Sequence, residues 1–130
     1  MLLDSKECQA SARPAGNLSA PLSILRIMLT VDPRYGGPVE AVRTSSLEMA
    51  KFGHSTEILT LDEPESAHVA AFPFPVHAVR PWIRRYGYTP ELAGWVRKNA
   101  ERFDIAIIEG LWNHSSIGGA RGLRYSGLPF

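Results

Sequence analysis

The sequence of 130 residues holds a single cysteine, Cys8, so no internal disulfide can form. It also lacks an apolar run of the roughly 20 residues that a membrane-spanning helix needs, and its N-terminal stretch lacks the apolar core of a signal peptide. We therefore expect a cytoplasmic protein that contacts the inner face of a membrane only peripherally. No two histidines have the spacing of metal ligands on one helix, and we expect neither a metal site nor a cofactor.

An excess of charge of one sign is also missing. The formal net charge is +1, from 14 basic and 13 acidic residues, so bulk electrostatics give no reason to expect a nucleic-acid partner. Apolar residues make up 45% of the chain and charged residues 21%, which is typical of a soluble globular protein. A chain of this length has room for one domain with a real core and is too short for two of ordinary size.

Three familiar motifs are absent: the dinucleotide-binding G-x-G-x-x-G, the phosphate-binding G-x-x-x-x-G-K-[ST] and the nucleophile elbow G-x-S-x-G. The chain instead has two adjacent glycines, Gly36 and Gly37, between an apolar run and an amphipathic segment. Bare backbone N–H groups at a helix N-terminus suit a phosphate or a sugar hydroxyl. The same glycines can equally serve a tight turn that needs a positive φ, and the residues alone do not decide between the two.

Apolar and β-branched runs alternate with amphipathic segments from residue 23 onward. We predict three parallel strands, a short proline-flanked edge strand and three helices, with Gly53 ending the first helix and Thr89 capping the second. The strands are expected at 24–29, 56–61, 104–109 and, at the edge, 76–79; the helices at 39–52, 90–102 and 116–125; and a surface loop at 62–72. The alternation predicts a three-layer α/β/α Rossmann-like sandwich over residues 23–130, after a disordered leader at 1–22.

The last three residues, Leu128, Pro129 and Phe130, look like the start of a further strand. Because the sequence stops as a core strand begins, we expect an incomplete domain. One side of the sheet would then be uncovered, and exposed apolar surface of this kind promotes association.

The order of several short segments is more informative than any one of them. They are the Arg34-Tyr35-Gly36-Gly37 loop, residues 47–50, the Phe52-Gly53-His54 break, the β run ending at Leu59 and Thr60, and the later stretch FDIAIIEGLWNHSS at 103–116. In this order and spacing they resemble the amino-terminal domain of GT-B-fold glycosyltransferases of family 4. The resemblance spans residues 25–130 and leaves out the leader.

The resemblance implies half of a two-domain enzyme of the retaining hexosyltransferase type. Such enzymes move a sugar from a nucleotide-sugar donor to a saccharide or lipid-linked acceptor, as in polysaccharide and cell-envelope glycan synthesis. Their amino-terminal domain shapes the acceptor side, and a second domain grips the donor with an acidic motif. Neither that domain nor the family's usual active-site histidine is in this sequence, so we expect the catalytic residues to lie outside it and the chain alone to be inactive.

The resemblance makes Gly36 and Gly37 the loop that faces the donor phosphates and the acceptor, with Arg34 next to them. The family often has histidine where Glu109 stands. After the strand at 104–109, three more candidates for substrate binding offer an aromatic platform and hydrogen-bonding groups, which sugars need: Trp112, Asn113 and His114. The other interpretation of this segment is a helix entry capped by Asn113 or Ser115.

The remaining histidines and one aromatic loop give weaker signals. We expect His54 to be a structural turn residue, and His68 and His77 to have no ligand-spaced partner. A loop combines arginine with aromatic residues, which suits acceptor or anionic headgroup recognition; it can also be a solvated loop whose aromatics fold back on the core. Its residues are Arg80, Trp82, Arg84, Arg85, Tyr86 and Tyr88.

Two other functions stay open on the sequence. One is a non-catalytic Rossmann-like binding or interaction module that lacks the transferase half. The other is a phospho-acceptor receiver domain, which requires an acidic pair after the first strand and an aspartate at the end of the third. Only Asp32 meets that pattern.

Overall fold

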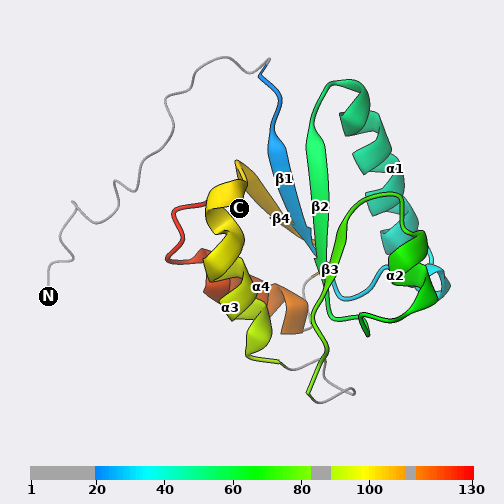
Figure 1. Cartoon of the computed structure of the whole chain (residues 1–130). Helices are drawn as coiled ribbons and strands as arrows, with labels where there is room; N and C mark the ends of the chain where they lie inside the picture. Colours follow the sequence, from blue (N-terminus) through cyan, green and yellow to red (C-terminus); the bar gives the residue numbers. More distant parts are fainter. Residues whose placement is uncertain (1–19, 83–88, 111–113) are drawn as a thin grey trace, which may run out of the picture.

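The structure is a computed structural model that describes residues 20–82, 89–110 and 114–130. In this part of the chain, four strands form one all-parallel sheet in the order β3-β2-β1-β4 (Figure 1). The strands are β1 (Ser23–Ile27), β2 (Ser55–Thr60), β3 (Val76–Ala78) and β4 (Ile105–Ile108). The parallel pairing and the edge position of β3 are confirmed. Most of the predicted leader lies outside the described residues.

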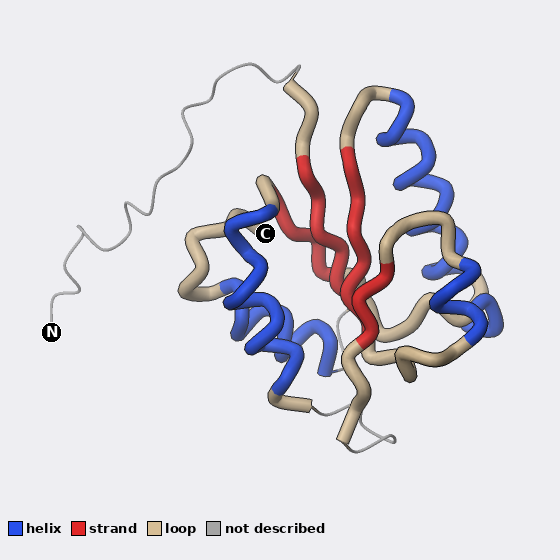
Figure 2. Tube along the Cα trace, in the orientation of Figure 1, coloured by secondary structure: helices blue, strands red, loops and turns tan. Residues whose placement is uncertain are grey.

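Helices cover both faces of the sheet (Figures 1 and 2). One layer holds α1 (Gly37–Lys51) and α2 (Ala67–Ala71), and the other holds α3 (Glu91–Asn99) and α4 (His114–Leu123). Two short 3-10 turns, η1 (Pro33–Tyr35) and η2 (Ala100–Arg102), precede α1 and follow α3. The predicted Rossmann-like α/β fold is therefore confirmed. None of the helices in the described ranges has both the length and the apolar character needed to cross a bilayer.

Each face of the sheet has its own apolar core, because side chains along a strand alternate between the two faces. Leu25 and Ile27 of β1 and Leu59 of β2 belong to the core that contains residues of α3 and α4. Met28 and Ile58 belong to the core that contains residues of α1 and α2. From the helices come Leu92, Val96 and Leu123 on the first face, and Val39, Val42 and Val69 on the second.

The stretch 62–72 differs most from its prediction. It was expected to be a surface loop, but it contains α2 and a buried aspartate, Asp62. A helix of five residues is little more than one turn, so it shows no helical period in the sequence. Val69, Phe72 and Phe74 pack against the core under α1. This packing depends on residues elsewhere in the chain, so the local sequence pattern gives no sign of the helix.

The other helices are shifted slightly from their predicted bounds. α3 begins at Glu91, with Pro90 at the N-cap position, one residue later than expected. Thr89 nevertheless accepts a hydrogen bond from the Glu91 N–H, 3.2 Å away, as a capping side chain would. α4 starts at His114 instead of residue 116. As predicted, Gly53 follows the end of α1 with a positive φ of 86°.

The C-terminal residues lie along the outer side of β4. They form no strand in the structure, contrary to the prediction, yet Pro129 accepts a backbone hydrogen bond of 2.9 Å from Ala106 of β4. Leu128 is buried in the core beneath α3 and α4. The segment thus makes one contact of the kind expected from a fifth strand, without the repeated pairing that defines one.

Candidate functional site

The carboxyl ends of the parallel strands meet at one edge, at the bottom of Figure 1. The strands β1, β2 and β3 follow one another from the middle of the sheet to one edge. The last strand, β4, lies on the other side of β1. Ligands of open α/β sheets bind where the strand order reverses in this way. By this rule we expect the candidate site in the crevice at the carboxyl ends of β1 and β4.

Gly36 and Gly37 bring the N-terminus of α1 to this crevice. Gly36 is the N-cap of α1, and its φ of 69° and ψ of −124° favour glycine. Gly37 is the first helical residue and has no such φ. A Cβ atom built on either glycine would meet nothing within 4 Å. The turn interpretation therefore explains Gly36, while Gly37 leaves open backbone that no turn requires.

Arg34 is held at the rim of the crevice by Asp32. The Asp32 carboxylate accepts hydrogen bonds from Arg34 Nε at 2.9 Å, Arg34 Nη2 at 2.6 Å and the Arg34 backbone N–H at 2.9 Å. These bonds lower the pKa of Asp32 from its ordinary 3.8 to about 2, and Asp32 in turn raises the pKa of Arg34. Because the Arg34 side chain is 86% exposed, a fixed positive charge faces solvent here.

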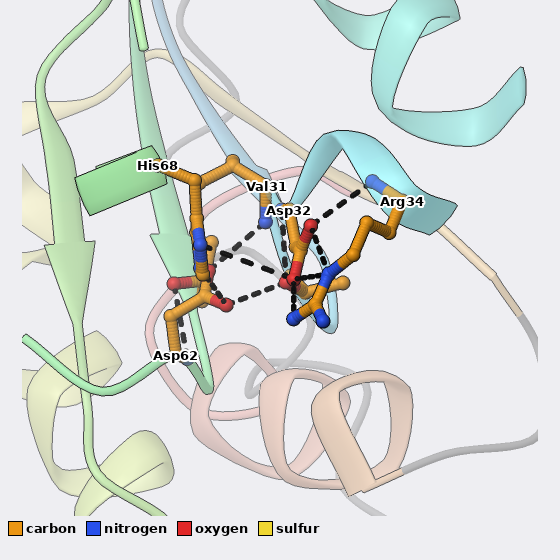
Figure 3. A network of polar contacts seen from close by, with 7 residues as sticks. Val31, Asp32, Arg34, Asp62 and His68 are labelled. Atoms are coloured by element: carbon orange, nitrogen blue, oxygen red, sulfur yellow. Dashed lines mark hydrogen bonds and ion pairs between the residues drawn. The ribbon is translucent and has the colours of Figure 1, made fainter. Parts of the chain in front are cut away.

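A second carboxylate, Asp62, lies beside Asp32 at the end of β2 (Figure 3). It accepts hydrogen bonds from the Thr30 hydroxyl and from the Val31 backbone N–H, the latter 2.9 Å long. His68 of α2 lies between the two carboxylates, with Nε2 2.9 Å from Asp62 Oδ1 and Nδ1 3.9 Å from Asp32 Oδ2. These contacts tie α2 to the ends of β1 and β2.

We call this network the clamp, because its carboxylates are engaged in contacts within the protein. Both aspartates are nearly buried, and each is bonded to donors of the protein itself. In the part of the chain that the structure describes, no group of three or more histidine, cysteine and acidic side chains could hold a metal ion. What the clamp does is fix the loop that carries Arg34 and Gly36.

A hollow of about 290 Å³ lies between η1, the first turns of α1 and α2. Much of its lining is apolar and comes from both helices, and its polar side chains are Glu40, Arg43 and His68. Gly36 also lines it, so the hollow adjoins the open N-terminus of α1. The apolar residues of the lining are Val31, Pro33, Val39, Ala71, Phe72 and Pro73.

On the other side of the crevice, Glu109 is fixed by a buried arginine. Arg26 of β1 donates to Glu109 Oε1 from Nε at 2.8 Å and from Nη2 at 2.6 Å. Its Nη1 donates to the hydroxyls of Ser45 and Ser46 in α1, at 2.7 and 3.2 Å. Only 9% of the Arg26 side chain is exposed. One residue of β1 thus joins the end of β4 to α1.

The structure places His114 but not its two neighbours. Trp112 and Asn113 lie outside the described residues. His114 is the first residue of α4, and its Nε2 lies 2.8 Å from the carbonyl oxygen of Thr89, just before α3. This contact agrees with the helix-entry interpretation, and a contact with substrate stays a prediction.

The other histidines have partners within the protein. His54 Nδ1 accepts a hydrogen bond of 3.0 Å from the Leu22 backbone N–H, which agrees with its predicted structural role. His77 contacts Glu57 at 2.6 Å and packs against Trp95, with ring centroids 4.8 Å apart.

Of the six residues named in the aromatic-basic loop, the structure describes two, Arg80 and Trp82. Trp82 is 66% exposed, so it does not fold back on the core. Arg80 is paired with Glu63 and Glu65, each at 2.7 Å. The remaining residues of the loop, at 84–88, lie outside the described residues.

Asp62 and His68 are the site residues that sequence reasoning missed. One signal was available: Asp62 directly follows Leu61 at the end of a predicted strand, as Asp32 follows the first strand. The carboxyl ends of neighbouring parallel strands share an edge, so the two aspartates could have been paired in advance. Nothing comparable marks His68, because its helix has no visible period.

Comparisons with protein-family models, with curated protein sequences and with solved structures found no match. The family resemblance of the sequence therefore stays a prediction, and the interpretation of the site depends on its geometry.

Proposed function

We propose that this domain is the acceptor-side half of a glycosyltransferase similar to those of family 4. Such an enzyme moves a sugar from a nucleotide-sugar donor to a saccharide or lipid-linked acceptor. The observation that carries the proposal is the position of Gly36 and Gly37, which open the N-terminus of a long helix at the reversal point of a parallel sheet.

The electrostatics of this loop suit the donor's phosphates. α1 has 15 residues, and the positive end of its dipole points into the crevice. Gly36 has no side chain to cap the first N–H groups, so those of Gly37 and Val39 can donate to an anion. Arg34 adds an exposed guanidinium that Asp32 holds in place, although the pair as a whole is neutral. Fixed dipoles and charges of this kind stabilise the negative charge that develops on a departing phosphate.

The adjoining hollow suits part of the acceptor. A sugar ring offers apolar C–H faces and a rim of hydroxyl groups, and the hollow offers apolar walls with polar side chains among them. Glu40 can accept hydrogen bonds from hydroxyl groups, and Arg43 can donate to them. His68 can do either, depending on its protonation state.

The test requires a protein in which this domain is joined to a donor-binding domain. There, Gly37→Ala should reduce sugar transfer at least about tenfold, equivalent to roughly 1.4 kcal/mol of transition-state stabilisation. The melting temperature should barely change, because the new Cβ meets open space. Gly94→Ala in α3 is the matched control, since its Cβ also meets nothing within 4 Å. Full activity in a normally folded Gly37→Ala protein would mean that this loop does not contact the substrate.

One observation favours the alternative of a non-catalytic binding or interaction module. The carboxylates at the crevice, Asp32, Asp62 and Glu109, all accept hydrogen bonds from donors of the protein itself. The coding sequence that follows Phe130 distinguishes the two functions. A second α/β domain in frame, with two glutamates eight positions apart as in the family's acidic motif, supports the transferase. The chain alone should show no turnover with common nucleotide sugars in either case.

A further inference from the structure

The two helical layers differ in charge. α1 carries two acidic and two basic residues, which pair as Glu40 with Arg43 and Glu48 with Lys51. The opposite layer, residues 91–102 and 114–130, carries five basic and two acidic residues and so a formal charge of +3. This layer of a near-neutral chain is therefore positive, although one of its five basic residues, Arg102, pairs with Glu57 of β2.

Part of this positive side is also apolar. Ile117 and Arg121 lie on α4, and Arg124 lies in the turn directly after it. With Phe130 these residues line a hollow of about 520 Å³. Ile117 is 55% exposed, Phe130 61% and the adjoining Tyr125 84%. Among the described residues, neither arginine has an ion-pair partner. We call these five residues the α4 face.

The orientation of this face is fixed by the opposite side of the helix. Gly118, Gly119 and Gly122 are buried, and Gly119 lies close to Ile27 of β1. A Cβ on Gly122 would lie 2.7 Å from the Val96 Cβ of α3, so the two helices are in very close contact. A rotation of α4 about its axis would break these contacts, so the α4 face is held toward the solvent.

We propose that the α4 face docks on an anionic membrane surface. Arg121 and Arg124 would meet lipid phosphates, while Ile117, Tyr125 and Phe130 enter the boundary between headgroups and acyl chains. Basic residues near an anionic bilayer are each attracted by about 1 kcal/mol, and aromatic side chains favour the same depth. A nucleic acid would match the arginines but offers no hydrocarbon for Ile117. The inference does not depend on the proposed transferase function.

The experiment measures binding of the whole chain to vesicles by co-sedimentation. Phosphatidylcholine vesicles with phosphatidylglycerol should bind the protein, and vesicles of phosphatidylcholine alone should bind it far more weakly. Replacing both arginines, Arg121→Gln with Arg124→Gln, should weaken binding roughly 25-fold, from about 1 kcal/mol for each charge. Added salt should weaken binding of the original protein, because it screens exposed charges.

The matched control removes the same two charges from the other layer, as Arg43→Gln with Lys51→Gln. It should leave vesicle binding within about twofold, because these residues face away from the docked side. Ile117→Ser should weaken binding without changing its salt dependence. Thermal melting of each variant, followed by circular dichroism, checks that the fold is intact.

Several results would overturn the inference. Equal loss in both double variants would mean that net charge, and not the α4 face, drives binding. Equal binding to neutral and anionic vesicles would exclude the role of the arginines. Absence of vesicle binding, with an α4-dependent dimer in sedimentation or α4-dependent binding of a mixed-sequence single-stranded RNA, would assign the face to another partner.

Discussion

The two helical layers are attached to the same sheet by different means. α1 and α2 are joined to the strands by buried polar links as well as apolar contacts, through Arg26 to Ser45 and Ser46, and through His68 to Asp62. α3 and α4 are joined by apolar contacts and by glycines that let backbones come close. Hydrogen bonds and ion pairs fix the orientation of a helix on the sheet as well as its distance from it. They occur in the layer that carries the Gly36 loop. The glycine-packed layer leaves its long charged side chains on the outside.

The largest expected effect comes from breaking a polar link. Arg26→Ala should lower the free energy of unfolding by about 3 kcal/mol, because Glu109 loses its charged partner and Ser46 its donor at a buried position. Arg43→Ala should cost less than about 1 kcal/mol, because its pair with Glu40 is exposed. Urea unfolding of both variants checks the contrast. Equal and small losses would mean that the buried link does not hold α1 to the sheet.

The glycine-packed layer should respond to added volume instead. Gly122→Ala should destabilise by about 2 kcal/mol, because the new Cβ collides with Val96 and approaches the Ala93 carbonyl. Gly94→Ala, in open space within α3, should stabilise by up to about 1 kcal/mol through its better helix propensity. Thermal or urea unfolding gives both values. Stabilisation by Gly122→Ala would show that the two helices are not in tight contact.

A smaller effect is expected from acid. The pKa of Asp32 is about 2 in the folded protein, below its ordinary 3.8, so ionised Asp32 adds stability above pH 3.8 that is lost as the pH falls toward 2. Asp32→Asn should therefore be less stable near neutrality and show a flatter decline of melting temperature across this window. If the melting temperature of the variant fell with pH as it does in the original protein, ionised Asp32 would not contribute to stability.

The sequence predicts the strands well because their signal is local. The strands predicted at 24–29, 56–61, 76–79 and 104–109 each overlap an observed one, since β-branched and apolar runs such as IAII in β4 are distinctive. The strand start predicted at 128–130 forms none. The α2 helix and the role of His68 could not be predicted with equal ease, because they depend on neighbours far along the chain. The pairing of Asp32 with Asp62 could have been predicted, because each follows a predicted strand. Arg26 looked like an interruption of a core strand, and its role depends on Glu109, 83 residues away. The glycines of α4 weakened the helix prediction, whereas the structure uses them for close packing.

The most direct test of the proposal that the Gly36 loop faces the phosphates of a nucleotide sugar is an NMR titration of this domain joined to a donor-binding domain. Backbone amide signals would be followed while a uridine- or guanosine-diphosphate sugar is added. Within this domain we expect the largest shifts at Gly36, Gly37 and Val39, smaller shifts in the Gly37→Ala variant, and none at α4. Shifts confined to other parts of the sheet, or an unperturbed Gly36 loop at the highest ligand concentration, would contradict it.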